Sequence, residues 1–315
     1  MGMKLVFCGT PPFAVPSLEA LAAAGFDVRL VVTQPDRPQG RGMAVTAPPV
    51  KQAADRLNLP VVQPEKIKAN EEFRKKLESL KPEAIIVVGY GRLIPAWMLQ
   101  LPPRGNINVH ASLLPKYRGA APIQWAIARG ETVTGVTTML LNESLDTGDI
   151  LLQSKTEIQP DDTAVTLARR LSSLGADLLV KTLGGLEQGS VRPIPQDHAQ
   201  ATLAPILKKE DGQVDFNRSA VEIVNRLRGF HPWPGAHARF RGKDLKIIAA
   251  RPASTGLRLG LGLAPGELAA EKEKLFAGCG GGALELLQVQ LEGKKTMTAQ
   301  EFINGYKPAP GDRLG

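Results

Sequence analysis

The chain has 315 residues, of which 43% are hydrophobic, and it carries a formal net charge of +8. This length and hydrophobic content are sufficient for two domains with separate cores. There is no uninterrupted apolar stretch of bilayer length, only two cysteines and no cluster of His and Cys, so we expect no membrane contact, no metal and a reducing, cytoplasmic location. The positive charge favours an anionic partner, although moderate basicity alone more often indicates only a solvated surface.

The N-terminal region has the pattern of a β-α-β unit. A compact apolar strand is predicted at residues 5–9, a helix at 14–24 and a second strand from Asp27. This pattern predicts a parallel sheet. The turn GTPPFAV has one glycine where a dinucleotide fingerprint needs three, and the chain has no GxxxxGK[ST] motif, which argues against nicotinamide and nucleotide-hydrolysis chemistry.

Residues 34–49, QPDRPQGRGMAVTAPP, are rich in Pro and Gly and are predicted to form an irregular loop without helix or strand. Long loops inside compact domains are usually lids or disordered connections. Beyond it, residues 50–57 and 70–80 read as amphipathic helices around a short strand, VVQ, and a fully buried strand begins at Ala84. That strand ends near Tyr90, Gly91, Leu93 and Ile94, whose apolar side chains could hold a flat ring, although they could equally be the cap of a core strand.

A cluster of polar residues is predicted between residues 106 and 149. Asn106, Asn108 and His110 are spaced by two, so they project from one face of a strand that opens into the loop 112–122. A helical pattern resumes at residue 123, and the turn LDTGD then separates two further strands, 135–142 and 149–158. Polar groups at the end of a strand that opens into a loop are typical of a ligand crevice in an α/β sheet.

These residue types suit an oxyanion that forms on a carbonyl carbon. An Asn amide donates hydrogen bonds without titrating, and a carboxylate, from Asp146 or Asp149, would orient the His, favour its charged form and accept a proton. No nucleophilic side chain is needed. The alternative is a buried His that a neighbouring Asp satisfies for structural reasons only.

The sequence pattern changes in the second half of the chain, most clearly from residue 209. A long helix is predicted at 163–186 and a linker at 189–208. Beyond the linker we expect a helix at 220–227, a last helix capped by Thr298 and Glu301, and four short strands between them, at 236–240, 245–251, 275–279 and 283–291. We therefore predict an α/β protein: a Rossmann-like, mostly parallel sheet domain at 1–188 followed by a small OB-like β-barrel domain at 209–315. The basic stretch 226–251, with Trp233 interleaved, suits a nucleic-acid backbone or else a solvated face; its candidate contacts are Arg239, Arg241, Lys243 and Lys246.

The segment 106–149 resembles the 10-formyltetrahydrofolate-dependent formyltransferases, which share an Asn-x-His strand, a Ser-Leu-Leu-Pro loop and an Asp-x-Gly turn. The similarity covers nearly all 315 residues, and it includes KLVFCGTPPFAVPSLEAL, TQPDRPQGRG, IIVVGYGRLIP, SLLPKYRGAAPIQWAI and FHPWPGAHARF. It implies that Asn108, His110 and Asp146 are catalytic. It also implies a folate site lined by Ser112, Leu113, Leu114 and Pro115, next to Tyr90, Gly91, Leu93 and Ile94, and contacts of Arg37 and Arg41 with the acceptor end of a tRNA. Lys116-Tyr117 stands where many relatives have Arg-Trp.

The resemblance implies a specific reaction. We expect transfer of the formyl group of 10-formyltetrahydrofolate to the free amino group of methionine on initiator tRNA, by a cytoplasmic monomer whose partners are this tRNA and folate, with no metal and no membrane. One rival is a formyltransferase for a small amine, such as glycinamide ribonucleotide or an amino sugar, which would need neither the basic second domain nor Arg41. The other is a nucleic-acid-binding module with an inactive first domain, against which the intact Asn108, His110 and Asp146 argue.

Overall fold

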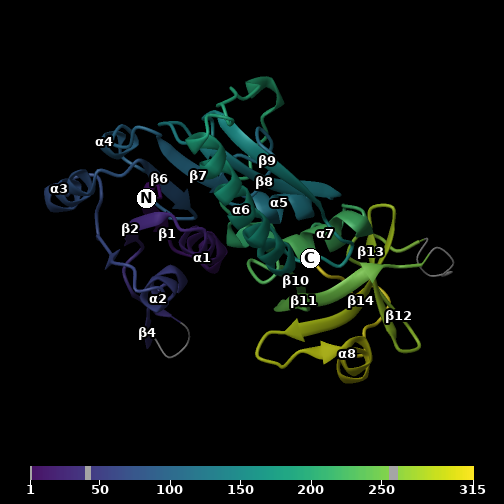
Figure 1. Ribbon diagram of the computed structural model, residues 1–315. Coiled ribbons are helices and arrows are strands. Elements are labelled where there is room, and N and C mark those ends of the chain that lie inside the picture. The colour runs from purple at the N-terminus through teal and green to yellow at the C-terminus, as the bar shows by residue number, and fades with distance from the viewer. Residues whose placement is uncertain (1, 40–43, 255–261) are drawn as a thin grey trace. The chain divides into compact units, whose positions relative to one another are not determined.

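The computed structural model describes residues 2–39, 44–254 and 262–315, and the chain forms two compact units (Figure 1). The first unit contains Met1–Pro122, Val133–Glu157 and Ala168–Pro205. The second contains Ile206–Gly315 together with two short central segments, Ile123–Thr132 and Ile158–Leu167. In the ranges described, no helix has both the length and the apolar character that a membrane span requires.

The first unit is built on a seven-stranded sheet. Its first five strands pair in parallel, and β8 alone among the seven runs the opposite way, antiparallel to both β7 and β9, which confirms the predicted Rossmann-like, mostly parallel sheet. The order across the sheet is β5 (Val61–Val62), β2 (Asp27–Val32), β1 (Lys4–Gly9), β6 (Ala84–Val88), β7 (Asn106–His110), β8 (Val133–Leu140) and β9 (Ile150–Glu157).

The central strands β6 and β7 are buried along their whole length, and β6 (AIIVV) is entirely apolar, as expected for a parallel sheet covered by helices. On one face, alternate residues of β1, β2 and β6 pack against Phe73 and Leu77 of α3 (Glu71–Leu80), a helix that begins where the Asn70 side chain accepts the Phe73 N–H at 3.0 Å. Gly175 of α6 (Ala164–Glu187) lies so close to β7 and β8 that an added Cβ would approach Val109 to 2.9 Å. The unit also contains α1 (Val15–Ala23), α2 (Pro49–Arg56) and α4 (Ala96–Leu99).

The strand order reverses between β1 and β6, because the chain builds outward from β1 toward β5 and then from β6 toward β9. In open α/β sheets ligands bind at the carboxyl ends of the strands on either side of such a switch point. Here those ends are Gly9 and Val88, and His110 ends β7, the neighbour of β6. The fold therefore places the predicted polar cluster at a favourable edge of the sheet.

The prediction of an irregular loop at 34–49 was wrong in part. β3 (Arg37–Gln39) and β4 (Ala44–Thr46) form a small antiparallel hairpin. Strands of three residues are too short to show an alternating pattern, and Pro38 argues against a strand unless it lies at an edge, as it does in this isolated pair. The base of the hairpin is held by Asp36, which accepts hydrogen bonds from Lys51 at 2.7 Å and Gln63 at 2.6 Å. Arg41 lies outside the described residues.

The segment 189–205 packs on the first unit. Ile194 exchanges two backbone hydrogen bonds of 2.8 Å with Ile150, and Ala204 donates its N–H to the carbonyl of Arg118 at 2.7 Å. A Cβ on Gly119 would approach the Ala204 carbonyl to 2.5 Å, so the two backbones meet where only glycine fits. Residues 189–205 therefore lie against the loop that follows β7.

The second unit is built on an antiparallel sheet of six strands. Residues 313 and 314 form bridges to residues 267 and 240, next to the two outer strands, which supports the predicted small barrel. The four predicted strands are confirmed, but two shorter ones were missed. The strands are β10 (Ala236–Phe240), β11 (Lys243–Pro252), β14 (Gly282–Leu291), β13 (Lys274–Cys279) and β12 (Leu268–Glu271), with β15 (Met297–Thr298) beside β14.

Three helices accompany this sheet: α5 (Pro122–Ala128), α7 (Ala220–Gly229) and α8 (Ala299–Tyr306). The predicted cap of α8 is confirmed, because Thr298 and Glu301 form a reciprocal capping box. Phe302 of α8 is fully buried and its ring lies 5.1 Å from that of Phe240. Aromatic packing of this kind fixes the helix on the barrel.

Candidate active site

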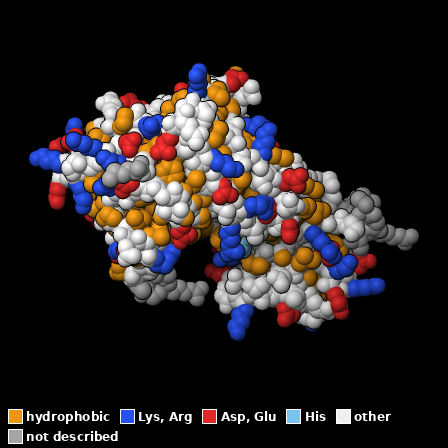
Figure 2. Space-filling model, in the orientation of Figure 1, with side chains coloured by type: hydrophobic (Ala, Val, Ile, Leu, Met, Phe, Trp, Pro, Cys, Tyr) orange, Lys and Arg blue, Asp and Glu red, His pale blue; other side chains and the backbone are white. Residues whose placement is uncertain are grey.

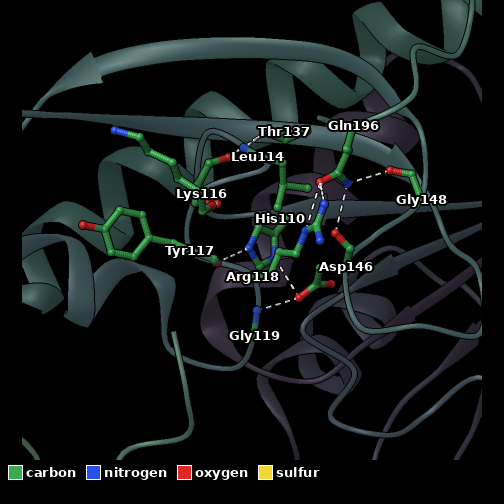
Figure 3. Close-up of polar contacts among 11 residues, drawn as sticks. His110, Leu114, Lys116, Tyr117, Arg118, Gly119, Thr137, Asp146, Gly148 and Gln196 are labelled. Carbon is green, nitrogen blue, oxygen red and sulfur yellow. Dashed lines mark hydrogen bonds and ion pairs between the residues drawn. The ribbon is translucent and has the colours of Figure 1, made fainter. Parts of the chain in front are cut away.

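His110 lies at the end of β7 and is only 6% exposed (Figure 3). Its Nε2 lies 2.8 Å from the backbone carbonyl of Tyr117, and its Nδ1 lies 3.7 Å from Oδ2 of Asp146. A carbonyl only accepts hydrogen bonds, so Nε2 carries a proton. Nδ1 is therefore the ring nitrogen that faces the carboxylate, at a separation longer than a direct hydrogen bond.

Asp146 lies on the turn between β8 and β9, with its backbone in the left-handed region at φ 50. The N–H of Gly119 donates to its Oδ2 at 2.8 Å, so the same oxygen is approached by Gly119 and by His110. Of the two acids that the sequence left open, Asp146 forms the ion pair; no ion pair joins His110 to Asp149 in the part of the chain that the structure describes. The predicted His and Asp are thus brought together.

The two asparagines of β7 differ in what they contact. Asn106 donates through Nδ2 to the carbonyls of Met98 and Leu99, both at 3.0 Å, and so ties β7 to the end of α4. Asn108 is 9% exposed, and its amide forms no hydrogen bond within the described ranges. Oδ1 of Asn106 is also without a partner, but its Nδ2 is engaged, so Asn108 is the asparagine whose N–H groups remain to be donated to a ligand.

The loop after β7 is held rigidly over β8 and β9. Thr137 of β8 donates its hydroxyl to the Ser112 carbonyl at 2.7 Å and accepts the Leu114 N–H at 3.1 Å, and Gln153 of β9 donates to the Leu114 carbonyl at 2.8 Å. The side chains of Ser112 and Leu114 are buried, whereas Leu113 and Pro115 are partly exposed. This loop therefore presents mainly backbone to the edge of the sheet.

The residues after β6 that were predicted to hold a flat ring differ in their exposure to solvent. The Tyr90 ring is 1% exposed and packs in the core, where burial raises the pKa of its hydroxyl, whereas Leu93 is 87% exposed. Ile94 packs against the same core, and Gly91 has a φ of +77. The Tyr90 ring is thus part of the core, and Leu93 is the side chain of this group that projects into solvent.

Sequence reasoning missed Arg118 and Gln196. Both are buried, and Gln196 accepts hydrogen bonds from the Arg118 guanidinium at 2.6 and 3.1 Å while its amide donates to the carbonyls of Asp146 at 2.9 Å and Gly148 at 2.7 Å (Figure 3). Gln196 comes from the segment 189–208, which has no apolar period. No local signal in the sequence marks it.

The candidate tRNA contacts are only partly free. Arg37 pairs with Glu65 at 3.1 Å, Arg239 lies 3.6 Å from Asp244, and Arg241 donates to Asp312 and to the carbonyl of Tyr306. Within the same basic stretch, Arg226 and Arg228 donate to backbone carbonyls and Arg251 pairs with Glu285. Lys243 and Lys246 are exposed and show no ion pair within the described ranges.

On the face that Figure 2 shows, Lys and Arg side chains alternate with Asp and Glu rather than form one continuous basic patch. His237 and Lys246 are cross-strand partners, as are Arg239 and Asp244, so these four side chains share the outer face of β10 and β11. Of the candidate cations of this strand pair, Lys243 and Lys246 are those without an ion pair among the described residues.

Comparisons with known proteins identify the family of the chain. The formyl transferase family matches residues 3–183, and the formyl transferase C-terminal domain matches residues 206–307. Methionyl-tRNA formyltransferase of Koribacter versatilis is 65% identical over 314 residues, 99% of each chain, and that of Acidobacterium capsulatum is 62% identical over 99% of this chain and all of its own.

Solved structures share the fold. An N-formyltransferase from Helicobacter canadensis, in complex with folinic acid and dTDP-3-aminofucose, is 20% identical with a TM-score of 0.67 over 90% of this chain and 98% of its own. HypX from Aquifex aeolicus in complex with tetrahydrofolic acid is 18% identical with a TM-score of 0.59 over 96% of this chain and 47% of its own. With full-length relatives above 60% identity and a His–Asp pair at the sheet edge, the chain belongs to the methionyl-tRNA formyltransferase family of formyl-transferring enzymes.

Proposed function

We propose that the chain transfers the formyl group of 10-formyltetrahydrofolate to the free amino group of methionine esterified to initiator tRNA, with Asn108, His110 and Asp146 as the catalytic residues. The observation that carries the assignment is the His110 ring, held between the Tyr117 carbonyl and the Asp146 carboxylate, with the unpaired Asn108 amide two residues away on the same strand. The names of the full-length relatives support the choice of substrates.

In this mechanism the amine attacks the formyl carbon. A C–N bond forms, the bond between that carbon and N10 of the folate breaks, and N10 leaves with a proton while the amine loses one. Asn108 donates to the developing oxyanion. Because Nε2 of His110 already donates to Tyr117, Nδ1 is the ring nitrogen that remains for Asp146 and the reacting group. Asp146 orients the ring and receives the surplus amine proton directly or through water.

The residues around this centre fit a folate with a flat ring. The backbone of Ser112, Leu113, Leu114 and Pro115 borders one side, and Tyr90, Gly91, Leu93 and Ile94 follow the neighbouring strand. We assign the edge recognition of the ring to backbone groups, because the Ser112, Leu114 and Tyr90 side chains are buried in protein. The hydrophobic contact falls to Leu93 and Ile94.

For tRNA, we assign catalysis to residues 1–188 and acceptor binding to residues 209–315, joined through 189–208. Arg37 lies in β3, Arg41 follows it in the sequence, and Arg239, Arg241, Lys243 and Lys246 belong to β10, β11 and the turn between them. Support for the second group is the shared outer face of these strands and the exposure of its lysines. We place the reaction in the cytoplasm and expect a monomer.

Formyl transfer with charged initiator tRNA, measured beside small amines under the same conditions, tests this function. We expect transfer to the charged tRNA alone, and a loss of about 10²–10³ in kcat for either Asn108→Ala or His110→Ala. Transfer to a small amine, and not to the tRNA, would assign the chain to another acceptor. Binding of tRNA without any transfer would leave only a nucleic-acid-binding module.

A further inference from the structure

The Gln196 side chain, outside the predicted catalytic set, contacts both the Asp146 turn and the loop after β7. It is 6% exposed, and both ends of its amide are engaged. Nε2 donates to the carbonyls of Asp146 and Gly148, and Oε1 accepts from Nε and a terminal nitrogen of Arg118. A side chain with every polar atom paired in a buried site has one allowed position.

The two segments that Gln196 joins are those that hold the two nitrogens of His110. Tyr117, which accepts from Nε2, directly precedes Arg118, and Gly119, which directly follows it, donates to the Asp146 carboxylate that faces Nδ1. The Arg118 guanidinium donates to Oε1 of Gln196 and also to Nδ1 of His198, and neither acceptor is a carboxylate. Arg118 therefore anchors the loop after β7 through contacts that do not involve the Asp146 carboxylate, so this carboxylate remains available to His110.

We propose that Gln196 is a positioning residue for formyl transfer: by fixing the Asp146 turn against Arg118, it sets the separation between Asp146 and His110. This inference rests on the proposed function. The Asp146 backbone lies in the left-handed region, which is uncommon for residues other than glycine although Asp adopts it more readily than most, and the two hydrogen bonds that Gln196 donates to the carbonyls of Asp146 and Gly148 hold the turn in this conformation. Displacement of a catalytic group by about 1 Å can cost about 10²-fold in rate.

Two substitutions separate donation by Gln196 from simple filling of its site. Gln196→Glu keeps the volume and accepts from Arg118, but it cannot donate to the carbonyls of Asp146 and Gly148. Gln196→Met removes both functions. We expect each to lower kcat by about 10²-fold, with KM for folate and for charged tRNA close to wild type. A Gln196→Glu enzyme with wild-type kcat, or losses confined to KM, would overturn the proposal.

Gln200 provides the matched control. It lies in the same segment, it is exposed, and its amide donates to Asp197 only. Gln200→Glu should therefore keep the wild-type kcat. A loss in Gln200→Glu equal to that in Gln196→Glu would show that added charge in the segment causes the effect and would refute the role of Gln196.

A measurement without substrate tests the same placement independently of catalysis. The Gly119 N–H donates to Asp146 at 2.8 Å, so its hydrogen exchange reports whether the carboxylate is in place. We expect faster exchange of this amide in folded Gln196→Met than in wild type; unchanged protection would overturn the proposal. A wild-type chain that transfers no formyl group would instead overturn the proposed function, and the Gly119 measurement would still decide the placement.

Discussion

Charged side chains occur both around His110 and on the outer face of the strand pair β10–β11, but they differ in their burial and in the contacts that they make. Around His110, the imidazole, Arg118 and Gln196 are buried, the Asp146 side chain is 12% exposed, and the four are linked to one another, while the Asn108 amide is left open. On the outer face of β10 and β11 the cations are exposed: Arg239 lies 3.6 Å from Asp244, and Lys246 shows no ion pair among the described residues. The first arrangement fixes distances, as bond making requires, whereas the second provides charge without fixed geometry, as phosphate binding requires.

Removal of the Asp146 charge should have the largest effect, because it affects the fixed region. In Asp146→Asn, Gly119 can still donate to the side-chain oxygen, but His110 loses its carboxylate. We expect kcat for formyl transfer to fall by about 10²–10³. Asp149→Asn serves as the control, because Asp149 makes no ion pair with His110 among the described residues. Equal losses in the two variants would mean that overall charge, and not the Asp146 contact, matters.

A smaller loss is expected when the backbone beside this region is strained. Gly119 has a φ of +120, and an added Cβ would approach the Ala204 carbonyl to 2.5 Å. Gly119→Ala should lower the free energy of unfolding by more than about 1 kcal/mol and reduce kcat, because the Gly119 N–H moves away from Asp146. Gly189→Ala, which also has a positive φ but nothing within 4 Å of the added Cβ, isolates the conformational cost. We therefore expect Gly119→Ala to have a lower melting temperature and a lower kcat than Gly189→Ala. Equal kcat values would show that the Gly119 N–H does not affect turnover through Asp146.

The sequence predicted the centre of the site and missed its support. Strand alternation placed Asn108 and His110 on one face and the turn offered Asp146 or Asp149, whereas the catalytic set of Asn108, His110 and Asp146 came from the family resemblance. The parallel sheet and four barrel strands were predicted from local patterns. Gln196 contacts Arg118 across 78 residues of chain, and no period connects them. The Tyr90 ring shows the same limit: the sequence located the carboxyl end of β6, but a continuous apolar run does not reveal which side chains turn into the core.

The sequence pattern also did not predict that two central segments, Ile123–Thr132 and Ile158–Leu167, belong to the second unit. Trp125 of α5 packs edge-to-face on Phe230 at 5.2 Å, and Gly229 lets α7 approach the backbone of Ala128. Amphipathic periods predicted these helices without predicting their partners. Helix position in a fold is decided by contacts between residues far apart in sequence, which a single chain does not display.

Substitutions on β10 and β11 should change affinity for tRNA more than turnover at saturating tRNA. We expect Lys246→Ala to weaken binding and to reduce the slope of log affinity against log salt by about one unit, if it contacts one phosphate. Arg241→Ala should instead lower the melting temperature with little change in that slope, because its guanidinium is held by Asp312 and the Tyr306 carbonyl. A salt slope that stays constant in Lys246→Ala would remove this lysine from the tRNA surface.

The smallest expected effect concerns the pH dependence of stability in the barrel. Glu285 is 4% exposed, and two hydrogen bonds from Arg251, at 2.8 and 3.0 Å, hold its pKa below the usual value of 4.5. A carboxyl whose pKa is lower in the folded state stabilises the fold fully above 4.5 and loses that contribution as the pH falls through the folded pKa. Urea unfolding of wild type and Glu285→Gln should therefore give a difference in free energy that is constant near neutral pH and shrinks below pH 4.5. Because other carboxyls titrate alike in both proteins, this difference isolates Glu285, and a difference that does not change with pH would show that Arg251 stabilises the carboxyl and the neutral amide equally.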